Sequence, residues 1–381
     1  MEHCCVECFA DECLRKFIAQ SGAAGDCDFC GARGVPVLSP DGLKSACEPV
    51  IQVYEEELPE RDVPRLRRRG KPLYEVLQDD WSVFSDAGIG SAEPLLAAVL
   101  GDPSRARQEA VGWRDGASGE WARELWQEFV ALLTYRSRFA FPRIAASGLV
   151  QDDPAARVRC VLREAATERT LTVGDTVWRA RRPGRAGLEA WVGPAGQDPH
   201  EWYGPPPPQH RAAGRANAEG IGVFYGALDD VTAAYEMQPI RDEHVWVADW
   251  HPKRDLRIAD LTTHTSRFSP FERPDVGHGV RVAAFQNVVS GALAEPVRTR
   301  GHYTDYLATQ YVAEVVRSWG FDGLLYSSAQ REGGENIAVW WEGEPLMLGA
   351  QRQHIWVKRI SYQGGQCDPE RQVPFPVRPW P

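Results

Sequence analysis

The sequence predicts an α+β protein in which a cysteine-rich, helical N-terminal part precedes a domain with a mixed sheet. Three observations support this prediction. Six of the nine cysteines lie within the first 30 residues, and helical periodicity is clearest in the stretch that follows. Further along the chain, short apolar runs typical of strands surround a single amphipathic helix.

Changes in composition divide the chain into four regions. Residues 1–35 form a predicted zinc-binding module that ends in glycines and a proline, and residues 36–150 form a predicted helical module. Residues 151–362 carry the mixed pattern of an α+β domain. Residues 363–381 are rich in proline and are predicted to form an extended tail. At roughly 150 residues per domain, the 381 residues are long enough for two or three domains.

Composition and charge exclude several classes of protein. With 43% hydrophobic and 25% charged residues, the chain has the make-up of an ordinary folded protein. Its net charge of −10 repels phosphate backbones, which makes a nucleic-acid partner a poor expectation. No run of roughly 20 apolar residues predicts a membrane helix, and the start MEHCCVEC lacks the pattern of a signal peptide. We therefore expect a cytoplasmic protein without a membrane partner.

The clearest helix of the second region lies within residues 118–139. Its apolar side chains recur at three- and four-residue steps, and Ser118 is expected to cap its N-terminus. The residues of this apolar face are Trp121, Leu125, Phe129, Leu132 and Leu133.

The third region alternates strand-like runs with one helix. The runs have the length and the β-branched or aromatic content of strands. They cover residues 221–227, 245–250, 256–261, 323–327 and 337–341. Between the third and fourth runs, a helix is predicted to begin at Thr304 as its cap and to stop at Gly320.

The N-terminal cysteines have the spacing of a structural zinc site. Cys5, Cys8, Cys27 and Cys30 form a C-x2-C-x18-C-x2-C pattern, in which two tight turns supply four thiolates to one tetrahedral ion. The residues between the turns are predicted to form a short helix with apolar Phe9, Leu14, Phe17 and Ile18. Four protein ligands leave no open position, so this zinc is expected to be structural. Buried or redox-active thiols are the alternative, and His3 or Cys4 could replace Cys5.

Three segments of the third region together resemble the RES domain family, which is named for its Arg, Glu and Ser residues. VWRAR at 177–181 resembles the opening strand of the family. GRAN-x-x-GI-x-x-FY followed by TA-x-x-E resembles its central block, and DG-x-x-Y-x-S resembles its serine segment. The cysteine-rich and helical N-terminal part looks like the zinc-containing, HEPN-related module found before some RES domains.

The resemblance implies a fold and an activity. RES domains resemble ADP-ribosyltransferases in fold and act in bacterial toxin–antitoxin systems by degrading NAD+, from which they release nicotinamide. Carried over by motif, Arg179, Glu236 and Ser328 are the expected catalytic residues. Arg215, Tyr225 and Ser327 are the expected substrate-binding residues, with the choice between the two adjacent serines left open.

These residue types suit cleavage of a nicotinamide–ribose bond. The reaction builds positive charge on the ribose, which a carboxylate such as Glu236 stabilises. Arg179 and Arg215 can bind the pyrophosphate of NAD+ because a planar guanidinium matches phosphate oxygens. Tyr225 offers a ring for stacking and Ser328 a hydroxyl for ribose or phosphate. The leaving group is already cationic, so a catalytic metal is not expected.

Other functions stay open at this point. An ADP-ribosyltransferase would use the same site but pass ADP-ribose to a protein or nucleic acid, and a binding or scaffold protein would carry an inactive RES domain. A HEPN-type ribonuclease is disfavoured because no histidine lies between His3 and His200. The resemblance also implies an antitoxin or regulatory partner, and it leaves self-association and the choice of water or phosphate as acceptor open.

Overall fold

The computed structural model describes residues 2–56, 70–85, 92–138, 153–182, 199–262, 269–272, 275–295 and 303–356, so the predicted tail at 363–381 lies outside them. The α-helices are α1 (Glu12–Ser21), α2 (Lys44–Glu56), α3 (Leu73–Trp81), α4 (Ala92–Leu100), α5 (Pro103–Ala106), α6 (Ala117–Tyr135), α7 (Pro154–Ala165), α8 (Pro199–Tyr203), α9 (Asp230–Tyr235), α10 (Val276–Ala294) and α11 (Leu307–Ser318). The strands are β1 (Cys4–Cys5), β2 (Ala23–Gly25), β3 (Val35–Leu38), β4 (Lys71–Pro72), β5 (Glu109–Ala110), β6 (Thr167–Leu171), β7 (Val177–Arg181), β8 (Val223–Ala227), β9 (His244–Pro252), β10 (Leu256–Asp260), β11 (Gly323–Ser327), β12 (Glu335–Trp340) and β13 (Leu346–Trp356).

The cysteine-rich N-terminus folds around a small sheet of order β1-β3-β2, with α1 against it. Asp11 caps α1, because its Oδ1 accepts a hydrogen bond of 3.0 Å from the backbone N–H of Leu14. Of the four apolar residues predicted between the cysteine turns, Phe9, Leu14 and Ile18 are buried. Phe17 is 40% exposed and lies outside this core.

Helix α6 covers the stretch in which the apolar periodicity predicts a helix. Leu125, Phe129 and Leu133 are buried along one face, as expected from their spacing. Ser118 is not the cap, and this prediction is wrong: the helix begins at Ala117 after Gly116, and Ser118 is buried inside the first turn. The earlier start follows from a turn at residues 112–116, whose backbone hydrogen bonds lead directly into the helix.

The second part of the chain contains the predicted mixed sheet. Its strand order is β13-β9-β7-β8-β12-β11-β10-β6, and only the β10–β11 pair is parallel among these neighbours. All five strand-like runs overlap strands of this sheet, namely β8, β9, β10, β11 and β12. The predicted α+β class with a mixed sheet is therefore confirmed.

The predicted helix at 304–320 is shorter than its pattern. Residues Tyr303–Tyr306 form a 3-10 turn, and α11 starts at Leu307, so Thr304 does not cap it. Gly320 follows the helix with a φ of 83°, a conformation that favours glycine and fits its predicted role as the stop.

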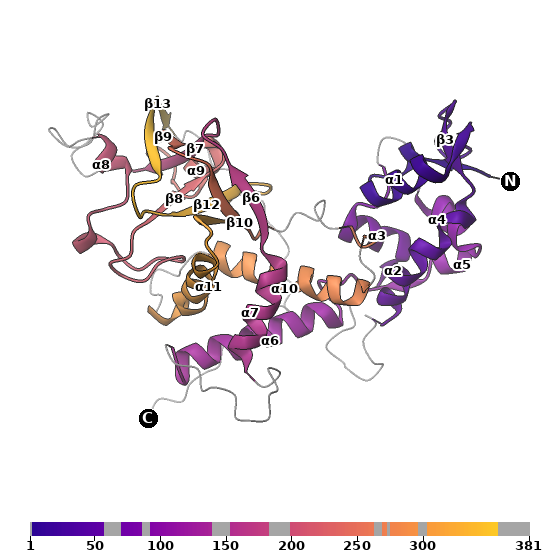
Figure 1. Ribbon diagram of the computed structural model, residues 1–381, viewed down its shortest axis with the longest axis horizontal. Helices are drawn as coiled ribbons and strands as arrows, with labels where there is room; N and C mark the ends of the chain where they lie inside the picture. The colour runs from indigo at the N-terminus through magenta and orange to yellow at the C-terminus, as the bar shows by residue number, and fades with distance from the viewer. Residues whose placement is uncertain are drawn as a thin grey trace.

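Helices cover the sheet unevenly (Figure 1). Helices α10 and α11 pack against β11, and α9 packs against β7, β8 and β9. Where no long helix lies, the buried rings of Phe224, Trp246 and Trp250 form a separate cluster on the sheet. Edge-to-face contact between Phe224 and Trp250, with centroids 5.0 Å apart, belongs to this cluster.

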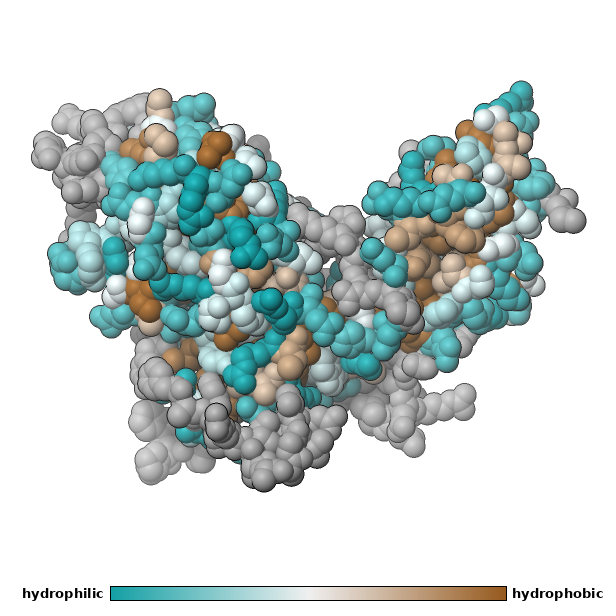
Figure 2. Space-filling model, viewed as in Figure 1, coloured by the Kyte–Doolittle hydropathy of each residue, from teal (hydrophilic) through white to brown (hydrophobic). Residues whose placement is uncertain are grey.

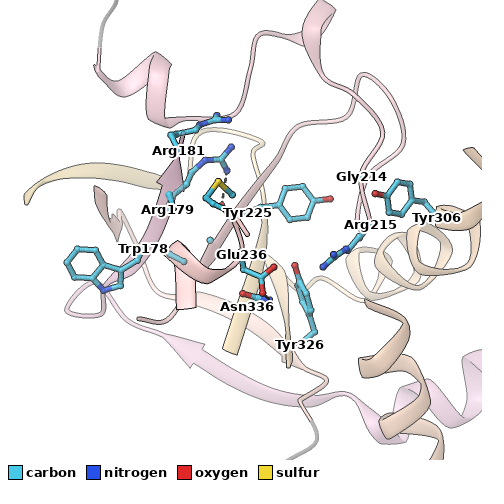
Figure 3. A pocket seen from close by; sticks show the side chains of 14 residues that line it. Trp178, Arg179, Arg181, Gly214, Arg215, Tyr225, Glu236, Tyr306, Tyr326 and Asn336 are labelled. Carbon is cyan, nitrogen blue, oxygen red and sulfur yellow. Dashed lines mark hydrogen bonds between the residues drawn. The ribbon is translucent and has the colours of Figure 1, made fainter. Parts of the chain in front are cut away.

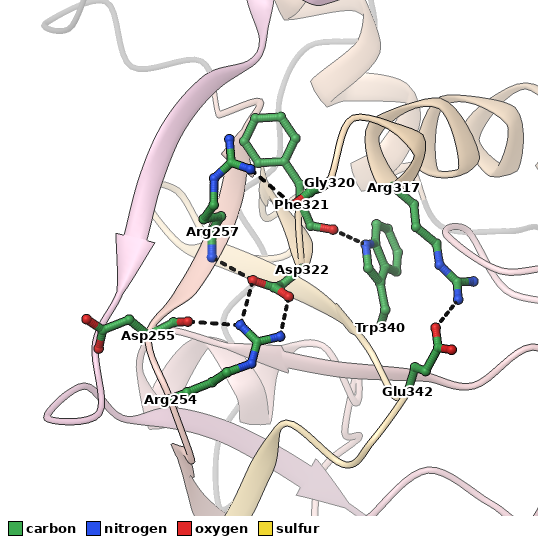
Figure 4. A network of polar contacts seen from close by, with 9 residues as sticks. All are labelled: Arg254, Asp255, Arg257, Arg317, Gly320, Phe321, Asp322, Trp340 and Glu342. Carbon is green, nitrogen blue, oxygen red and sulfur yellow. Dashed lines mark hydrogen bonds and ion pairs between the residues drawn. The ribbon is translucent and has the colours of Figure 1, made fainter.

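A polar network ties the edge of the sheet to the loop before β11 (Figure 4). Both carboxylate oxygens of Asp322 accept from Arg254, at 2.6 and 3.1 Å, and Oδ2 also accepts from the backbone N–H of Arg257 at 2.9 Å. Arg257 continues to Glu168 on β6 at 2.8 Å. These contacts fix β6, β10 and the start of β11 in register.

Helix α10 joins the two parts of the molecule. It packs on α11 and β11 at one end of its path and on α2, α6 and α7 along the rest (Figure 1). One continuous apolar core consequently runs from the N-terminal helices to the sheet. Polar side chains cover most of the sheet domain in Figure 2, whereas apolar ones reach the surface over the N-terminal helices. Within the described residues, no helix combines the length and apolar character needed to cross a membrane.

Candidate active site

The main candidate site is a pocket where strands β7 and β8 separate. Strand β7 pairs with β9 along its whole length but with β8 at only one position, Trp178 opposite Ala227. The opening beyond this pair is lined by residues of β7, β8, α9, β11 and β12 and has a volume of about 290 Å³. That size lies near the lower end of the range for small-molecule sites. Four predicted residues line it: Arg179, Arg215, Tyr225 and Glu236 (Figure 3).

Glu236 directly follows α9 and is held by two donors from other elements. Its Oε1 accepts hydrogen bonds from Ser328 Oγ at 2.6 Å and from Asn336 Nδ2 at 2.7 Å. Its Oε2 receives no hydrogen bond from any described residue. One oxygen therefore fixes the carboxylate, and the other is left for a ligand.

The turn after β11 holds Glu236 in place. Ser328 Oγ accepts from the backbone N–H groups of Gln330 and Arg331, at 3.1 and 3.2 Å, while it donates to Glu236. Arg331 also reaches the other end of α9, where its Nη1 donates to Asp229 Oδ1 at 2.6 Å and to Thr232 Oγ1 at 2.7 Å. Because Asp229 caps α9, this single turn contacts both ends of the helix that carries Glu236.

The two adjacent serines differ in their surroundings. Ser328 contacts Glu236, whereas the backbone N–H of Ser327 donates to Ser290 Oγ on α10 at 3.3 Å. The structure thus brings Ser328 to the carboxylate and does not bring Ser327 into the pocket lining. Ser328 itself stands behind Glu236 and does not line the pocket either.

Arg179, which is buried, and Arg181, which is half-buried, bring positive charge to the pocket. Arg179 Nη1 donates to the backbone oxygen of Tyr225 at 2.9 Å, and its guanidinium lies over the Phe224 ring at 4.9 Å. Burial, reinforced by repulsion from Arg181, lowers the pKa of Arg179. Among the described residues, neither arginine forms an ion pair with a carboxylate.

Tyr225 positions the loop that carries Arg215. Its hydroxyl donates to Asn217 Oδ1 at 2.7 Å and accepts from the backbone N–H of Ala216 at 2.9 Å. A Cβ at Gly214 would lie 2.6 Å from this hydroxyl, so the loop needs glycine there. Burial raises the pKa of Tyr225, and the phenol stays protonated. Its ring, rather than its hydroxyl, is left to face a ligand.

Tyr326 and Arg215 lie on the Glu236 side of the pocket (Figure 3). Burial raises the pKa of Tyr326 to about 12, and the Glu236 carboxylate adds to this effect, whereas the Arg215 guanidinium opposes it. Tyr326 is therefore a neutral donor between a carboxylate and a guanidinium.

Among the charged, hydroxyl and amide side chains that line the pocket, four were not predicted as site residues from the sequence: Arg181, Tyr306, Tyr326 and Asn336. Asn336 is 1% exposed, and of its two side-chain polar atoms only the amide nitrogen has a hydrogen-bond partner among the described residues. The sequence does contain a signal for Asn336. Asparagine is disfavoured in strands, whereas the rest of ENIAVW is typical of a buried strand. Tyr306 has no such signal, since it comes from a turn far along the chain.

The predicted zinc ligands form a second, separate cluster. The sulfur atoms of Cys5, Cys8, Cys27 and Cys30 all lie within 4.8 Å of one another, with three pairs at 3.4, 3.4 and 3.9 Å. A tetrahedral ion with Zn–S bonds of about 2.3 Å sets its sulfurs about 3.8 Å apart. Four thiols at this spacing fit zinc. Cys4 is outside the group and its thiol donates to the backbone oxygen of Leu38.

Residues 176–363 match the RES domain family, so the segment that contains the pocket is a RES domain. Among the curated proteins, none matches this chain. A chain in the crystal structure of the M. tuberculosis MbcT–MbcA toxin–antitoxin complex is similar, with a TM-score of 0.29 and 15% identity over 52% of this chain and 92% of that chain.

Proposed function

We propose that this protein cleaves NAD+ at the bond between nicotinamide and ribose. The RES domain supports an enzyme, and the arrangement around Glu236 suits this reaction. The observation that carries the proposal is a carboxylate fixed through one oxygen, in the same pocket as arginines that have no carboxylate partner. A cationic ribose beside the carboxylate and an anionic pyrophosphate beside the arginines match this charge pattern.

In the proposed reaction, the C1′–N bond breaks and its electron pair neutralises the pyridinium of the departing nicotinamide. The positive charge left on the ribose is stabilised by Glu236. If water is the acceptor, its oxygen bonds to C1′ and it loses a proton, which gives ADP-ribose. If phosphate is the acceptor, its oxygen bonds to the same carbon and gives ADP-ribose 1″-phosphate. Ser328 and Asn336 donate to Glu236, so they position the carboxylate in this scheme. Ser328 does not line the pocket, whereas Asn336 does.

Asn336 and Ser328 also fix the orientation of Glu236. Both donate to the same oxygen, Oε1, so two neighbours hold the carboxylate in one position. The carboxylate is then ready to stabilise a cation before the substrate arrives, so little reorganisation is needed during the reaction.

The four-cysteine cluster is proposed to bind a structural zinc. All four positions of such an ion would be taken by thiolates, which leaves none for substrate. The cluster belongs to the N-terminal part and contributes no residue to the lining of the pocket. We assign it to the stability of that part. A toxin or defence role, with an antitoxin as partner, is the biological setting we propose for the activity.

The deciding experiment is mass spectrometry of the products after incubation of the purified full chain with NAD+, with and without phosphate. We expect free nicotinamide together with ADP-ribose or its 1″-phosphate. Glu236→Gln should stop the release. Glu314→Gln, at an exposed site on α11, is the matched control. Release of nicotinamide only when an acceptor protein or nucleic acid is added would instead identify an ADP-ribosyltransferase. No release under either condition would leave a binding or scaffold protein.

A further inference from the structure

The loop that carries Arg215 is a small closed unit. The backbone N–H of Gly214 donates to the backbone oxygen of Asn217 at 2.9 Å, which closes residues 214–217 on themselves. The side-chain amide of Asn217, a residue that is 4% exposed, donates to three further backbone oxygens of the surrounding chain. Figure 3 shows the Arg215 side chain extending from this loop toward Tyr326. The position of the loop as a whole therefore decides where the guanidinium lies.

Gln310, on α11, ties this loop to the rest of the domain. Its Nε2 donates to the backbone oxygen of Gly214 at 2.9 Å and to that of Asn217 at 2.8 Å. An amide nitrogen carries two hydrogens, so this one group can hold both ends of the loop at once. Gln310 does not line the pocket. Any effect of this side chain on a ligand consequently passes through the loop and its arginine.

The next residue of α11, Tyr311, faces the N-terminal helices. Arg159 on α7 donates to the Tyr311 hydroxyl at 2.6 Å, and the Phe129 ring on α6 meets the Tyr311 ring edge to face, with centroids 5.1 Å apart. Phe129 is fully buried, so its own position is fixed by the core. In Figure 1, α11 lies between the sheet and α6, and it contacts both. The same turn of α11 therefore contacts the Arg215 loop through one residue and the N-terminal part through the next.

We propose that Gln310 is a positioning residue for Arg215, and that α6 and α7 fix its place through Tyr311. The proposal rests on the function proposed above, to which it adds a role for the N-terminal part: these helices support the substrate pocket. A guanidinium that is held in its binding position before the ligand arrives loses little conformational freedom on binding. Without the two hydrogen bonds from Gln310, the ligand itself would have to order the loop, and binding would be weaker.

Steady-state release of nicotinamide from NAD+ tests the positioning role. Gln310→Met keeps the length of the side chain but removes both donors. We expect KM to rise about 5- to 10-fold while kcat stays within about twofold, because the anionic part of NAD+ is charged in ground state and transition state alike. In an Arg215→Met protein, the same substitution should change KM by less than about twofold, since both changes then affect one interaction.

Hydrogen exchange in the absence of NAD+ tests the coupling to the N-terminal helices without using the proposed function. Tyr311→Phe keeps the ring but removes the acceptor for Arg159, and Gln310→Met releases the loop directly. Both should speed exchange in residues 211–218 by about 3- to 10-fold, the factor expected for the loss of roughly one hydrogen bond. Gln127→Met, at an exposed site on α6, is the matched control and should leave KM, kcat and exchange unchanged.

Gln310→Glu covers the case in which the methionine variant does not fold, because it keeps the shape of the side chain and replaces its donors by an acceptor. The proposal is overturned if loop exchange stays at the wild-type rate in a folded Gln310 variant or in Tyr311→Phe. It is also overturned if KM does not rise in the Gln310 variants, or if their effect adds in full to that of Arg215→Met. If the wild-type protein releases no nicotinamide, the proposed function is refuted, and hydrogen exchange alone decides whether α11 couples the loop to the N-terminal helices.

Discussion

The carboxylate of Glu236 and the guanidinium of Arg179 meet different parts of the proposed substrate. Positive charge on the ribose develops only in the transition state, whereas the pyrophosphate is charged throughout the reaction. Because of this difference, the two side chains should contribute to different kinetic constants.

We expect Glu236→Gln to lower kcat by about 100- to 1,000-fold, or roughly 3 to 4 kcal/mol, while NAD+ still binds. Arg179→Ala should weaken NAD+ binding as well as turnover. Calorimetry and nicotinamide release together separate the two effects, with circular dichroism as the check on folding. A Glu236→Gln protein that is folded and cleaves NAD+ at the wild-type rate would remove the carboxylate from the mechanism.

Asp80 is a buried acid in the helical part that predicts a pH dependence. It is 4% exposed, and burial raises its pKa to about 6 although Trp113, Tyr54 and Arg114 all donate to it. A folded-state pKa above the ordinary value of 3.8 means that the folded protein binds more protons than the unfolded chain between these two pH values. The stability from this group is therefore lost as the pH rises from about 4 to about 6.

Asp80→Asn should flatten that dependence. Raising the pKa of this carboxyl from 3.8 to about 6 changes the free energy of unfolding by at most about 3 kcal/mol. Denaturant unfolding of both proteins at several pH values between 4 and 7 measures this effect. The difference between their free energies of unfolding should change with pH. If that difference stays constant across the range, Asp80 has an ordinary pKa in the folded protein.

At the scale of elements, the turn that follows β11 is the support for Glu236. Ser328→Ala removes a hydrogen bond to a charged group, which is worth roughly 1.5 to 3 kcal/mol. We expect kcat to fall by about 10- to 100-fold with little change in the affinity for NAD+, because Ser328 does not line the pocket. Ser327→Ala is the neighbouring comparison and should have a much smaller effect on kcat, since Ser327 neither donates to Glu236 nor lines the pocket. Equal effects of the two substitutions would contradict this role of the turn.

The two cysteine turns and α1 form the second element with a testable role. Native mass spectrometry should find one zinc per chain, and Cys27→Ser should remove it and destabilise the N-terminal part. Cys160→Ser, at an exposed cysteine outside the cluster, is the control. Folded protein that carries no metal would refute the site. Nicotinamide release should persist in the Cys27→Ser protein as long as the sheet domain stays folded.

Local patterns predicted several elements of the fold, but they predicted neither helix α10 nor the full set of residues that meet in the pocket. The apolar face of α6 follows from its three- and four-residue periodicity. Strands β8 to β12 follow from short apolar runs with the length and the β-branched or aromatic content of strands. Ser118 and Thr304 look like caps locally, but the helices begin elsewhere because preceding turns decide their first residue. Arg181 and Asn336 meet in one pocket only through strand pairing, which spacing along the chain does not encode.

At the scale of the whole molecule, α10 links the RES domain to the N-terminal helices. The helix belongs to the RES segment, yet it packs on α2, α6 and α7 as well as on α11 and β11. Ser290, on the same helix, accepts a hydrogen bond from Ser327 next to the turn that supports Glu236. The sequence divides into a helical module and a RES domain. In the folded protein, however, the two share one apolar core. We propose that the two parts unfold together.

Phe285 in the middle of α10 tests this cooperativity. Its ring is fully buried and contacts Trp126 of α6 edge to face, with centroids 6.4 Å apart. Phe285→Ala should cost about 3 to 5 kcal/mol, the usual cost of emptying a buried aromatic site. If the core is shared, denaturant should unfold both parts in one transition with a lower midpoint, detected by hydrogen exchange in α6 and in β11 alike. Val173→Ala, at a 58% exposed position, should leave the midpoint unchanged. If the N-terminal part keeps its wild-type midpoint of unfolding while the sheet unfolds at lower denaturant, the two parts are independent domains. In that case α10 stabilises only the RES domain, to which its sequence belongs.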